Sequence, residues 1–314
     1  MNMLQGKTGN ARAPGRTRSR RREDTWPLLT MLIPGVLFYM IFKYAPLGGL
    51  VIAFKDYNFA DGVFGSPWVG LGHYETLFRQ AQTVGIIRNT FVLSVLSVVC
   101  GFPVPIALAI LMNEVRRMWF KRVVQTVVYL PHFFSWVIVG GIIVSIFSIE
   151  SGTINNWIEL AGGKPIPFLY DPTSWIAVFV GSGIWKEMGF SAIIYLAALT
   201  TIDPHLYEAA NIDGAGKWQQ IRHVTLPGIS TTIVLLFILQ LGKVMEVGFD
   251  QIFVLQNSLN AGVSEVISTY IYRMGLQGGQ FGLTAAMGLF ESLVGFVLVL
   301  SANALARRFG HGLF

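Results

Sequence analysis

The chain has 314 residues, of which 53% are hydrophobic and only 13% are charged, about half the charged share of an average globular protein. A soluble core of this size could not bury so much apolar surface, so the composition excludes an ordinary soluble enzyme and indicates lipid as the solvent for much of the chain. The single cysteine, Cys100, lies in an apolar run and excludes a disulfide framework and a cysteine-based metal site.

Residues 1–27 form a basic segment that accounts for much of the net charge of +6, because seven of the 23 Lys and Arg residues lie between Lys7 and Arg22. The segment has no apolar periodicity, so we predict a disordered cytoplasmic tail and no nucleic-acid partner. RNA binding by the tail is the alternative, since basic tails also attract nucleic acid. The apolar stretch that follows is longer than the core of a signal peptide and lacks a small-residue cleavage site, so we interpret it as a retained membrane span.

Six stretches of the remaining chain, residues 28–314, reach the roughly 20 apolar residues that a membrane helix needs. They are residues 28–53, 90–112, 123–149, 174–199, 229–249 and 283–305. The first is the least regular, because Lys43, Tyr44 and Pro46 interrupt it. Other stretches contain proline, such as Pro103 and Pro131, which membrane helices tolerate when neighbours satisfy the freed backbone groups. We therefore predict an all-α integral membrane protein with six transmembrane helices.

The orientation follows from the positions of Lys and Arg, which are enriched on the cytoplasmic side. With the N-terminus inside, fifteen lie in the inner segments and five in the outer loops, so both termini are expected to be cytoplasmic. The two largest outer loops, residues 54–89 and 250–282, carry aromatics that we expect to be exposed, such as Trp68, Tyr74 and Phe281. Long loops are often functional, so they could dock an extracytoplasmic partner; packing over the helix ends is the alternative.

The inner loop between the fourth and fifth stretches, residues 200–227, reads TTIDPHLYEAANIDGAGKWQQIRHVTLP. Asp203 followed by Pro204 is typical of a helix start, with a capping side chain and then a residue whose φ is already set. We predict a short helix over residues 205–212. Asp213 and Gly214 then form a turn in which a positive φ costs little.

The second half of this loop has apolar residues at helical spacing. Trp218, Ile221 and Val224 share one face, which predicts an amphipathic helix over residues 217–224. Pro227 is expected to close the loop just before the fifth span. A loop of this kind lying on the membrane surface is the structural alternative to a functional role.

The inner loop, residues 200–227, resembles the EAA loop of ABC importer permeases in the spacing of its residues. Glu208-Ala209-Ala210 is followed after three residues by Gly214, and after nine more by residues 224–227, with Val224 where the family usually has Ile. The resemblance implies a type I ABC importer permease fold whose coupling helix, between helices four and five, sits in a groove of a separate ATPase subunit. We name residues 200–227 the coupling loop. The small alanines would allow close approach, and the glutamate would meet a basic residue. The residues implied in ATPase docking are Glu208, Ala209, Ala210, Asp213, Gly214, Ala215, Leu226 and Pro227.

Five further segments resemble permeases that import oligosaccharides and polysaccharides, most of all those of alginate oligosaccharide importers of Gram-negative bacteria. They are FKDYN (54–58), GSPWVGL (65–71), VQTVVYLPHFFSW (124–136), GIWKEMG (183–189) and VISTYIYRMGL (266–276). The resemblance implies a bacterial inner-membrane location, a second and different permease, two ATPase subunits and an extracytoplasmic solute-binding protein that delivers the saccharide. The chain has no GxxxxGK[ST] motif, so ATP and Mg are expected on the ATPase subunits, and this chain is expected to be no enzyme and to hold no cofactor.

Ionisable residues inside the spans are costly and usually face a cavity or a partner. Lys243 and Glu246 lie three apart on one predicted helical face and could neutralise each other. Lys186 and Glu187 point about 100° apart on a helix, so at least one needs a partner on another helix. Together with Glu291, these residues hold two positive and three negative charges, so an acidic cargo rests on the resemblance alone.

Aromatic and polar residues near these charges could hold a sugar by ring stacking and hydrogen bonds to hydroxyls. Structural ion pairs between helices are the alternative explanation. The residues expected along the substrate path are His132, Ser135, Trp136, Trp185, Lys186, Glu187, Tyr195, Gln240, Lys243 and Glu246.

Other classes of protein fit less well. No HExxH or GxSxG motif is present, and the carboxylates are single, which disfavours a membrane-embedded enzyme. The sequence shows no internal repeat, which disfavours an ion-coupled secondary transporter. An ABC permease for another cargo, such as phosphate or amino acids, is the nearest alternative.

Overall fold

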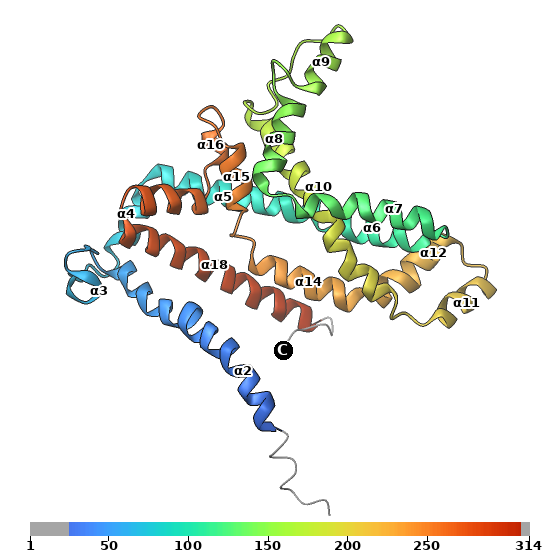
Figure 1. Cartoon of the computed structure of the whole chain (residues 1–314), viewed down its shortest axis with the longest axis horizontal. Helices are drawn as coiled ribbons and strands as arrows, with labels where there is room; N and C mark the ends of the chain where they lie inside the picture. Colours follow the sequence, from blue (N-terminus) through green and yellow to red (C-terminus); the bar gives the residue numbers. More distant parts are fainter. Residues whose placement is uncertain (1–24, 309–314) are drawn as a thin grey trace, which may run out of the picture. The chain divides into compact units, whose positions relative to one another are not determined.

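The computed structural model describes residues 25–308 (Figure 1). The regular elements of this part of the chain are all helices, and its only extended pairing is one isolated antiparallel bridge between Lys55 and Trp68. The predicted basic tail therefore lies almost wholly outside the described residues. Two compact units are present, one before Ile52 and one from Ile52 onward. They are taken in turn below.

The first unit is one helical run that changes its winding. It comprises α2 (Thr25–Tyr39), the π-helix η1 (Met40–Tyr44) and most of the 3₁₀-helix η2 (Ala45–Phe54). The predicted span over residues 28–53 is confirmed as one candidate span over residues 29–54, and its winding changes around Lys43, Tyr44 and Pro46, where the sequence is least regular. Pro46 lacks a backbone N–H, and the π turn just before it re-routes the hydrogen bonds without ending the helix.

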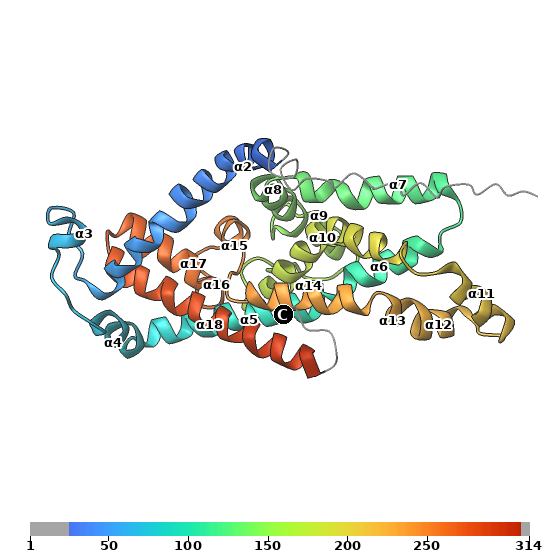
Figure 2. The same cartoon turned by 90° about the horizontal axis from the view of Figure 1, so that it is seen from below.

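The second unit contains the remaining helices of the described chain. They are α3 (Gly62–Gly65), α4 (Gly72–Arg79), α5 (Ala81–Gly101), α6 (Pro103–Glu114), α7 (Met118–Tyr129), η3 (Leu130–Phe133), α8 (Trp136–Phe147), α9 (Thr153–Leu160), α10 (Pro172–Leu199), α11 (Pro204–Ile212), α12 (Lys217–Gln220), η4 (Ile221–Thr225), α13 (Leu226–Gly228), α14 (Ser230–Gly242), α15 (Phe249–Leu255), α16 (Ala261–Ser264), α17 (Ile267–Tyr270), η5 (Ile271–Gln277) and α18 (Phe281–Arg308). Figures 1 and 2 show α11 and α12 at one end of this unit and α3 and α4 at the other.

Four helices of the described chain are long and apolar enough to cross a membrane, and two bent helix pairs raise the number to six if each pair is one span. The second candidate, Ala81–Glu114, joins α5 and α6 and begins nine residues before the predicted 90–112. It runs through Pro103 because a proline at the first position of a helix, here of α6, needs no hydrogen bond from its missing N–H.

The predicted continuous span over residues 123–149 was wrong. The chain bends by 106° between Met118–Phe133 and Trp136–Phe147. Pro131 tightens the last turn into the 3₁₀-helix η3, and the Ser135 hydroxyl caps α8 by accepting a hydrogen bond from the backbone N–H of Ile138 at 3.4 Å. A new N-cap starts a new helix direction.

The predicted span over residues 229–249 was also wrong at its C-terminal end. Helix α14 ends at Gly242, and residues 243–248 are not helical before α15 begins. Lys243 and Glu246 therefore do not share a helical face. Pro227 lies one residue before the end of Lys217–Gly228, and the chain bends by 62° before α14 begins at Ser230, so the loop closes where the sequence predicts.

The two loops that the sequence analysis expects outside are more ordered than the sequence indicates, because α3 and α4 occupy one and α15, α16, α17 and η5 the other. Trp68 is 63% exposed, as expected. The same expectation was wrong for Tyr74 and Phe281, which are only partly exposed. Tyr74 packs against a core cluster, and the Phe281 ring contacts Tyr57 at 6.0 Å, edge to face.

Two buried clusters hold the helices around α5 and α10. One joins α4, α5, α17 and α18 around residues such as Met287. The other joins α8, α10 and α15 around Trp175, which is fully buried and donates from its indole nitrogen to the carbonyl of Leu255 at 3.0 Å. These clusters fix the helices that form the cavity described below.

Candidate functional site

The first half of the coupling loop folds as its sequence predicts. The Asp203 side chain accepts a hydrogen bond from the backbone N–H of His205 at 3.0 Å, and Pro204 occupies the first position of α11. Gly214 has φ +76°, a left-handed conformation that favours glycine. The chain therefore reverses directly after α11.

Internal hydrogen bonds make the coupling loop one rigid hairpin. Gln220 is buried, and its amide nitrogen donates to the side-chain oxygen of Asn211 at 2.6 Å and to the carbonyl of Ala215 at 3.0 Å. The hydroxyls of Tyr207 and Thr225 share a hydrogen bond of 3.1 Å. The sequence analysis missed these residues, because a pair nine or eighteen positions apart leaves no local pattern.

The coupling loop is also fixed to the membrane helices. Lys217 forms an ion pair of 2.7 Å with Glu114 at the end of α6. Ile202 and Ile229, at the two ends of the loop, are buried in a third cluster with Leu199 of α10. A force on the hairpin is therefore transmitted to α6 and α10.

The outer surface of the hairpin is exposed and partly apolar. Ile212 is 87% and Trp218 is 73% exposed, and Leu206 is exposed beside them. The carboxylate of Glu208 is exposed and lies 3.1 Å from the ring of His205. Exposed large apolar side chains beside a charged group are typical of a surface that a partner covers. Of the predicted docking residues, the exposed ones are Glu208, Ala209, Asp213, Gly214 and Pro227, and the partly buried ones are Ala210, Ala215 and Leu226.

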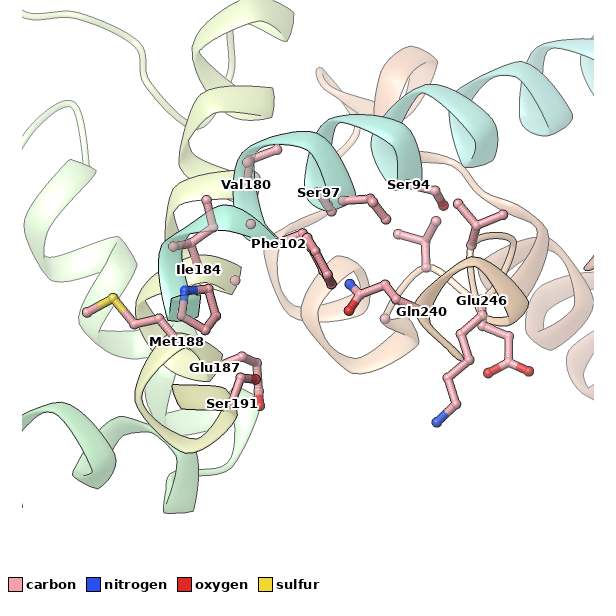
Figure 3. A pocket seen from close by; sticks show the side chains of 18 of the residues that line it. Ser94, Ser97, Phe102, Val180, Ile184, Glu187, Met188, Ser191, Gln240 and Glu246 are labelled. Carbon is pink, nitrogen blue, oxygen red and sulfur yellow. The ribbon is translucent and has the colours of Figure 1, made fainter. Parts of the chain in front are cut away.

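A cavity of about 540 Å³ lies between α5, α6, α10, α14 and the non-helical residues 243–248 (Figure 3). Six of the ten residues predicted for a substrate path line it, and they come from four separate segments. The six are Trp136, Glu187, Tyr195, Gln240, Lys243 and Glu246.

The cavity wall combines hydrogen-bonding groups with apolar and aromatic surface. Figure 3 shows Ser94 and Ser97 on α5, Ser191 on α10 and Gln240 on α14 around the space into which Phe102 projects. The serines were missed because isolated serines in an apolar run carry no periodic signal. Mixed polar and aromatic walls of this kind suit sugars, which present hydroxyls at their edges and C–H groups on their faces.

Lys243 and Glu246 enter the cavity because α14 stops at Gly242. Within the described part of the chain neither side chain forms an ion pair. Irregular backbone at membrane depth is tolerated where it lines a cavity or is buried in protein. The break in the fifth span therefore supplies one positive and one negative group to the wall.

The four other predicted path residues lie outside the cavity lining. Ser135 caps α8, and Trp185 is exposed elsewhere on α10. His132 and Lys186 lie behind Glu187: the Glu187 carboxylate accepts from Lys186 Nζ at 3.1 Å and from His132 Nδ1 at 2.8 Å. The expectation that Lys186 or Glu187 needs a partner on another helix is thus confirmed.

Comparison with known proteins places this geometry in a family. Residues 101–311 match the family described as binding-protein-dependent transport system inner membrane component. The polygalacturonan/rhamnogalacturonan transport system permease protein YteP of Bacillus subtilis (strain 168) is 46% identical over 283 residues, which cover 90% of this chain and 88% of that protein. Protein LplB of the same organism is 42% identical over 294 residues, covering 93% and 92%.

Comparison with solved structures supports the same family assignment. A chain in the crystal structure of a bacterial ABC transporter involved in the import of the acidic polysaccharide alginate is 43% identical, with a TM-score of 0.85 over 92% of this chain and 98% of that chain. A chain of the inward-facing MetNI methionine ABC transporter, 16% identical with a TM-score of 0.51 over 76% and 97%, shares the fold alone. This chain therefore has the type I ABC importer permease fold and belongs to the family of binding-protein-dependent transport system inner membrane components.

Proposed function

We propose that this chain is a transmembrane permease subunit of an ATP-driven importer that carries acidic oligosaccharides. The observation that carries the proposal is the coupling loop, a braced hairpin whose helices α11 and α12 lie at one end of the helical unit (Figure 2). The side chains of Ile212, Trp218 and Glu208 in this hairpin are exposed. Its outer face has the chemistry of a docking surface for a separate ATPase subunit. ATP and Mg would bind to that subunit.

The cargo assignment draws on the cavity and on the relatives. YteP is named for polygalacturonan and rhamnogalacturonan, and the alginate transporter for an acidic polysaccharide. Both cargoes contain uronic acids, so a negatively charged sugar chain is what they share. The serine, glutamine and aromatic groups of the cavity wall match sugar hydroxyls and ring faces.

The geometry suggests how ATP hydrolysis drives transport. Two ATPase subunits that close on ATP would pull the docked hairpins together. Because Lys217 is paired with Glu114, and Ile202 and Ile229 are buried beside α10, the helices would move with the hairpin as a rigid body. The cavity between α5, α10 and α14 would then open alternately to the two sides of the membrane.

The remaining partners follow from the same assignment. We expect a second, different permease subunit, and a solute-binding protein that docks on the outer loops around α3, α4 and α16. The protein would lie in a bacterial inner membrane with the coupling loop and both termini on the ATPase side.

Charge reversal on the coupling loop tests the assignment. In detergent the ATPase subunit should co-purify with the wild-type chain, and Glu208→Lys should abolish uptake and reduce ATPase retention without lowering expression. Glu159→Lys is the matched control, because Glu159 is also exposed but lies on α9; its ATPase retention should equal that of wild type. If no ATPase subunit binds the wild-type chain, the function is refuted. If ATPase binds but neutral sugars alone stimulate it, only the cargo assignment is refuted.

A further inference from the structure

The carboxylate of Glu187 would hinder an acidic cargo if its charge were not compensated. Its side chain is 46% exposed and lines the cavity, where an unpaired negative charge would repel a uronate chain. Lys186 stands behind it with a side chain that is only 7% exposed. Its ammonium lies 3.1 Å from Glu187 Oε1, so the cavity wall holds a neutral pair at this point.

Lys186 is held from three sides, so its charge has a fixed position. It donates to the backbone carbonyl of His132 at 2.9 Å as well as to Glu187. Its ammonium lies 5.4 Å from the centre of the Trp136 ring, within the range of a cation–π contact. A buried lysine without such partners would be costly.

His132 fixes the second oxygen of the same carboxylate. Its Nδ1 donates to Glu187 Oε2 at 2.8 Å, and its ring is stacked on Phe190 with centroids 4.0 Å apart and planes 4° apart. Each carboxylate oxygen thus has one protein donor and keeps lone-pair capacity toward the cavity. The geometry is that of a hydrogen-bond acceptor that is positioned before the sugar arrives.

We propose that Lys186 is a specificity-determining residue: it neutralises Glu187, so the cavity can accept an acidic oligosaccharide and still use a carboxylate to bind its hydroxyls. This inference rests on the proposed function. The other cavity charges, Lys243 and Glu246, cancel each other, so loss of Lys186 leaves the wall with a net negative charge. Lys186 acts through Glu187 and is a positioning residue for the sugar.

The test compares Lys186→Met, Glu187→Gln and the double variant in the complete transporter, reconstituted in liposomes with its ATPase subunits and binding protein. The measurement is ATPase stimulation by oligogalacturonate and by alginate oligosaccharide across a range of concentrations. Lys186→Met should raise the half-saturating concentration of the acidic oligosaccharide by about tenfold or more, because the Glu187 carboxylate would be left without its Lys186 partner and would repel the anionic sugar. The double variant should recover nearly to the level of Glu187→Gln, since no stranded charge remains.

Two further outcomes keep the proposal open to refutation. If Lys186 only braced the helix bend, the double variant would stay as impaired as Lys186→Met, and the proposal would be overturned. If Lys186→Met does not assemble, Glu187→Gln decides. It removes a hydroxyl acceptor for every sugar but leaves the Lys186 ammonium uncompensated, so the half-saturating concentration for oligogalacturonate should fall relative to that for the neutral, methyl-esterified oligosaccharide. An unchanged ratio would overturn the proposal. Failure of the wild-type transporter to respond to either acidic oligosaccharide would instead refute the proposed cargo.

Discussion

Replacing Gly214 with valine tests whether the coupling loop works through its shape. Gly214 has φ +76°, and an added Cβ would meet nothing within 4 Å. The turn is closed by hydrogen bonds from the backbone N–H of Gly214 to the carbonyl of Asn211 at 3.1 Å and from Ala215 to Ala210 at 2.9 Å. The Cβ of valine therefore meets no neighbour, and the main effect of the substitution is on the backbone.

The expected loss of affinity follows from the cost of a positive φ for a residue with a side chain. A residue with a Cβ pays about 1–2 kcal/mol in the left-handed region, which corresponds to roughly a five- to thirtyfold change in an equilibrium. If the turn relaxes to a negative φ, α11 and α12 change direction relative to each other, and the exposed Ile212 and Trp218 shift apart from their positions in the hairpin. The affinity for the ATPase subunit should fall by a factor in that range. Gly214→Asn should show a smaller loss, because asparagine tolerates this conformation better.

The assay is titration of purified ATPase subunit onto the permease in detergent, followed by measurement of cargo-stimulated ATPase activity. Gly162→Val is the matched control: Gly162 also has a positive φ, +82°, with open space around it, but it follows α9 and is not part of the coupling loop. Its ATPase affinity should equal that of wild type. Equal affinity for Gly214→Val and Gly162→Val would refute the argument that the shape of the turn matters.

Three further predictions concern stability. Asn155→Ala removes three hydrogen bonds of 2.8–3.0 Å that a buried side chain of α9 forms with the backbone of Ser148 before this helix and of Ile166 after it. The segment 148–166 should lose about 2–3 kcal/mol of local stability, measured by amide hydrogen exchange. Gly189→Ala should destabilise the protein by about 1–3 kcal/mol, because an added Cβ would collide with a backbone carbonyl of α7. The control is Gly181→Ala on the same helix, where the added Cβ meets open space, so the melting temperature in detergent should stay unchanged. Hydrogen bonds from the backbone and side chain of Ser174 hold the pKa of Asp171 below its ordinary value of 3.8; the stabilisation is therefore present above that pH and is lost as the pH falls through the lowered value. Asp171→Asn keeps the cap of α10 but should show no such acid-dependent loss of melting temperature, and a loss equal to that of wild type would contradict the assignment.

Much of the coupling loop could be predicted because its signals are local. The Asp203 cap, the proline after it and the glycine turn each act on backbone within a few residues, and the structure bears out all three. The brace by Gln220 could not be predicted, because its partner Asn211 is nine residues away and becomes a neighbour only when the hairpin closes.

The two broken spans show the limit of hydropathy. The stretches around residues 134 and 243 are apolar enough to suggest unbroken helices, yet the chain bends at one and unwinds at the other. Neighbouring helices permit this by satisfying freed polar groups, as Lys186 does for the carbonyl of His132 and as the Ser268 hydroxyl does when it donates to the carbonyl of Val247 at 3.3 Å. Hydropathy is an average over a window of neighbouring residues, so it cannot show hydrogen-bond partners that come from other helices.

The sequence by itself determined that the chain is a membrane protein, where the coupling loop lies and how it starts and turns, because composition and backbone preference act within one segment. Only the tertiary structure decided which polar residues meet in the cavity. Glu187 and His132 are 55 residues apart, and their hydrogen bond exists because α10 packs against the bend before α8. The same packing sets Lys186 behind the carboxylate, and the end of α14 at Gly242 places Lys243 and Glu246 in the cavity lining, so the charge of the cavity wall depends on the tertiary structure and not on one segment.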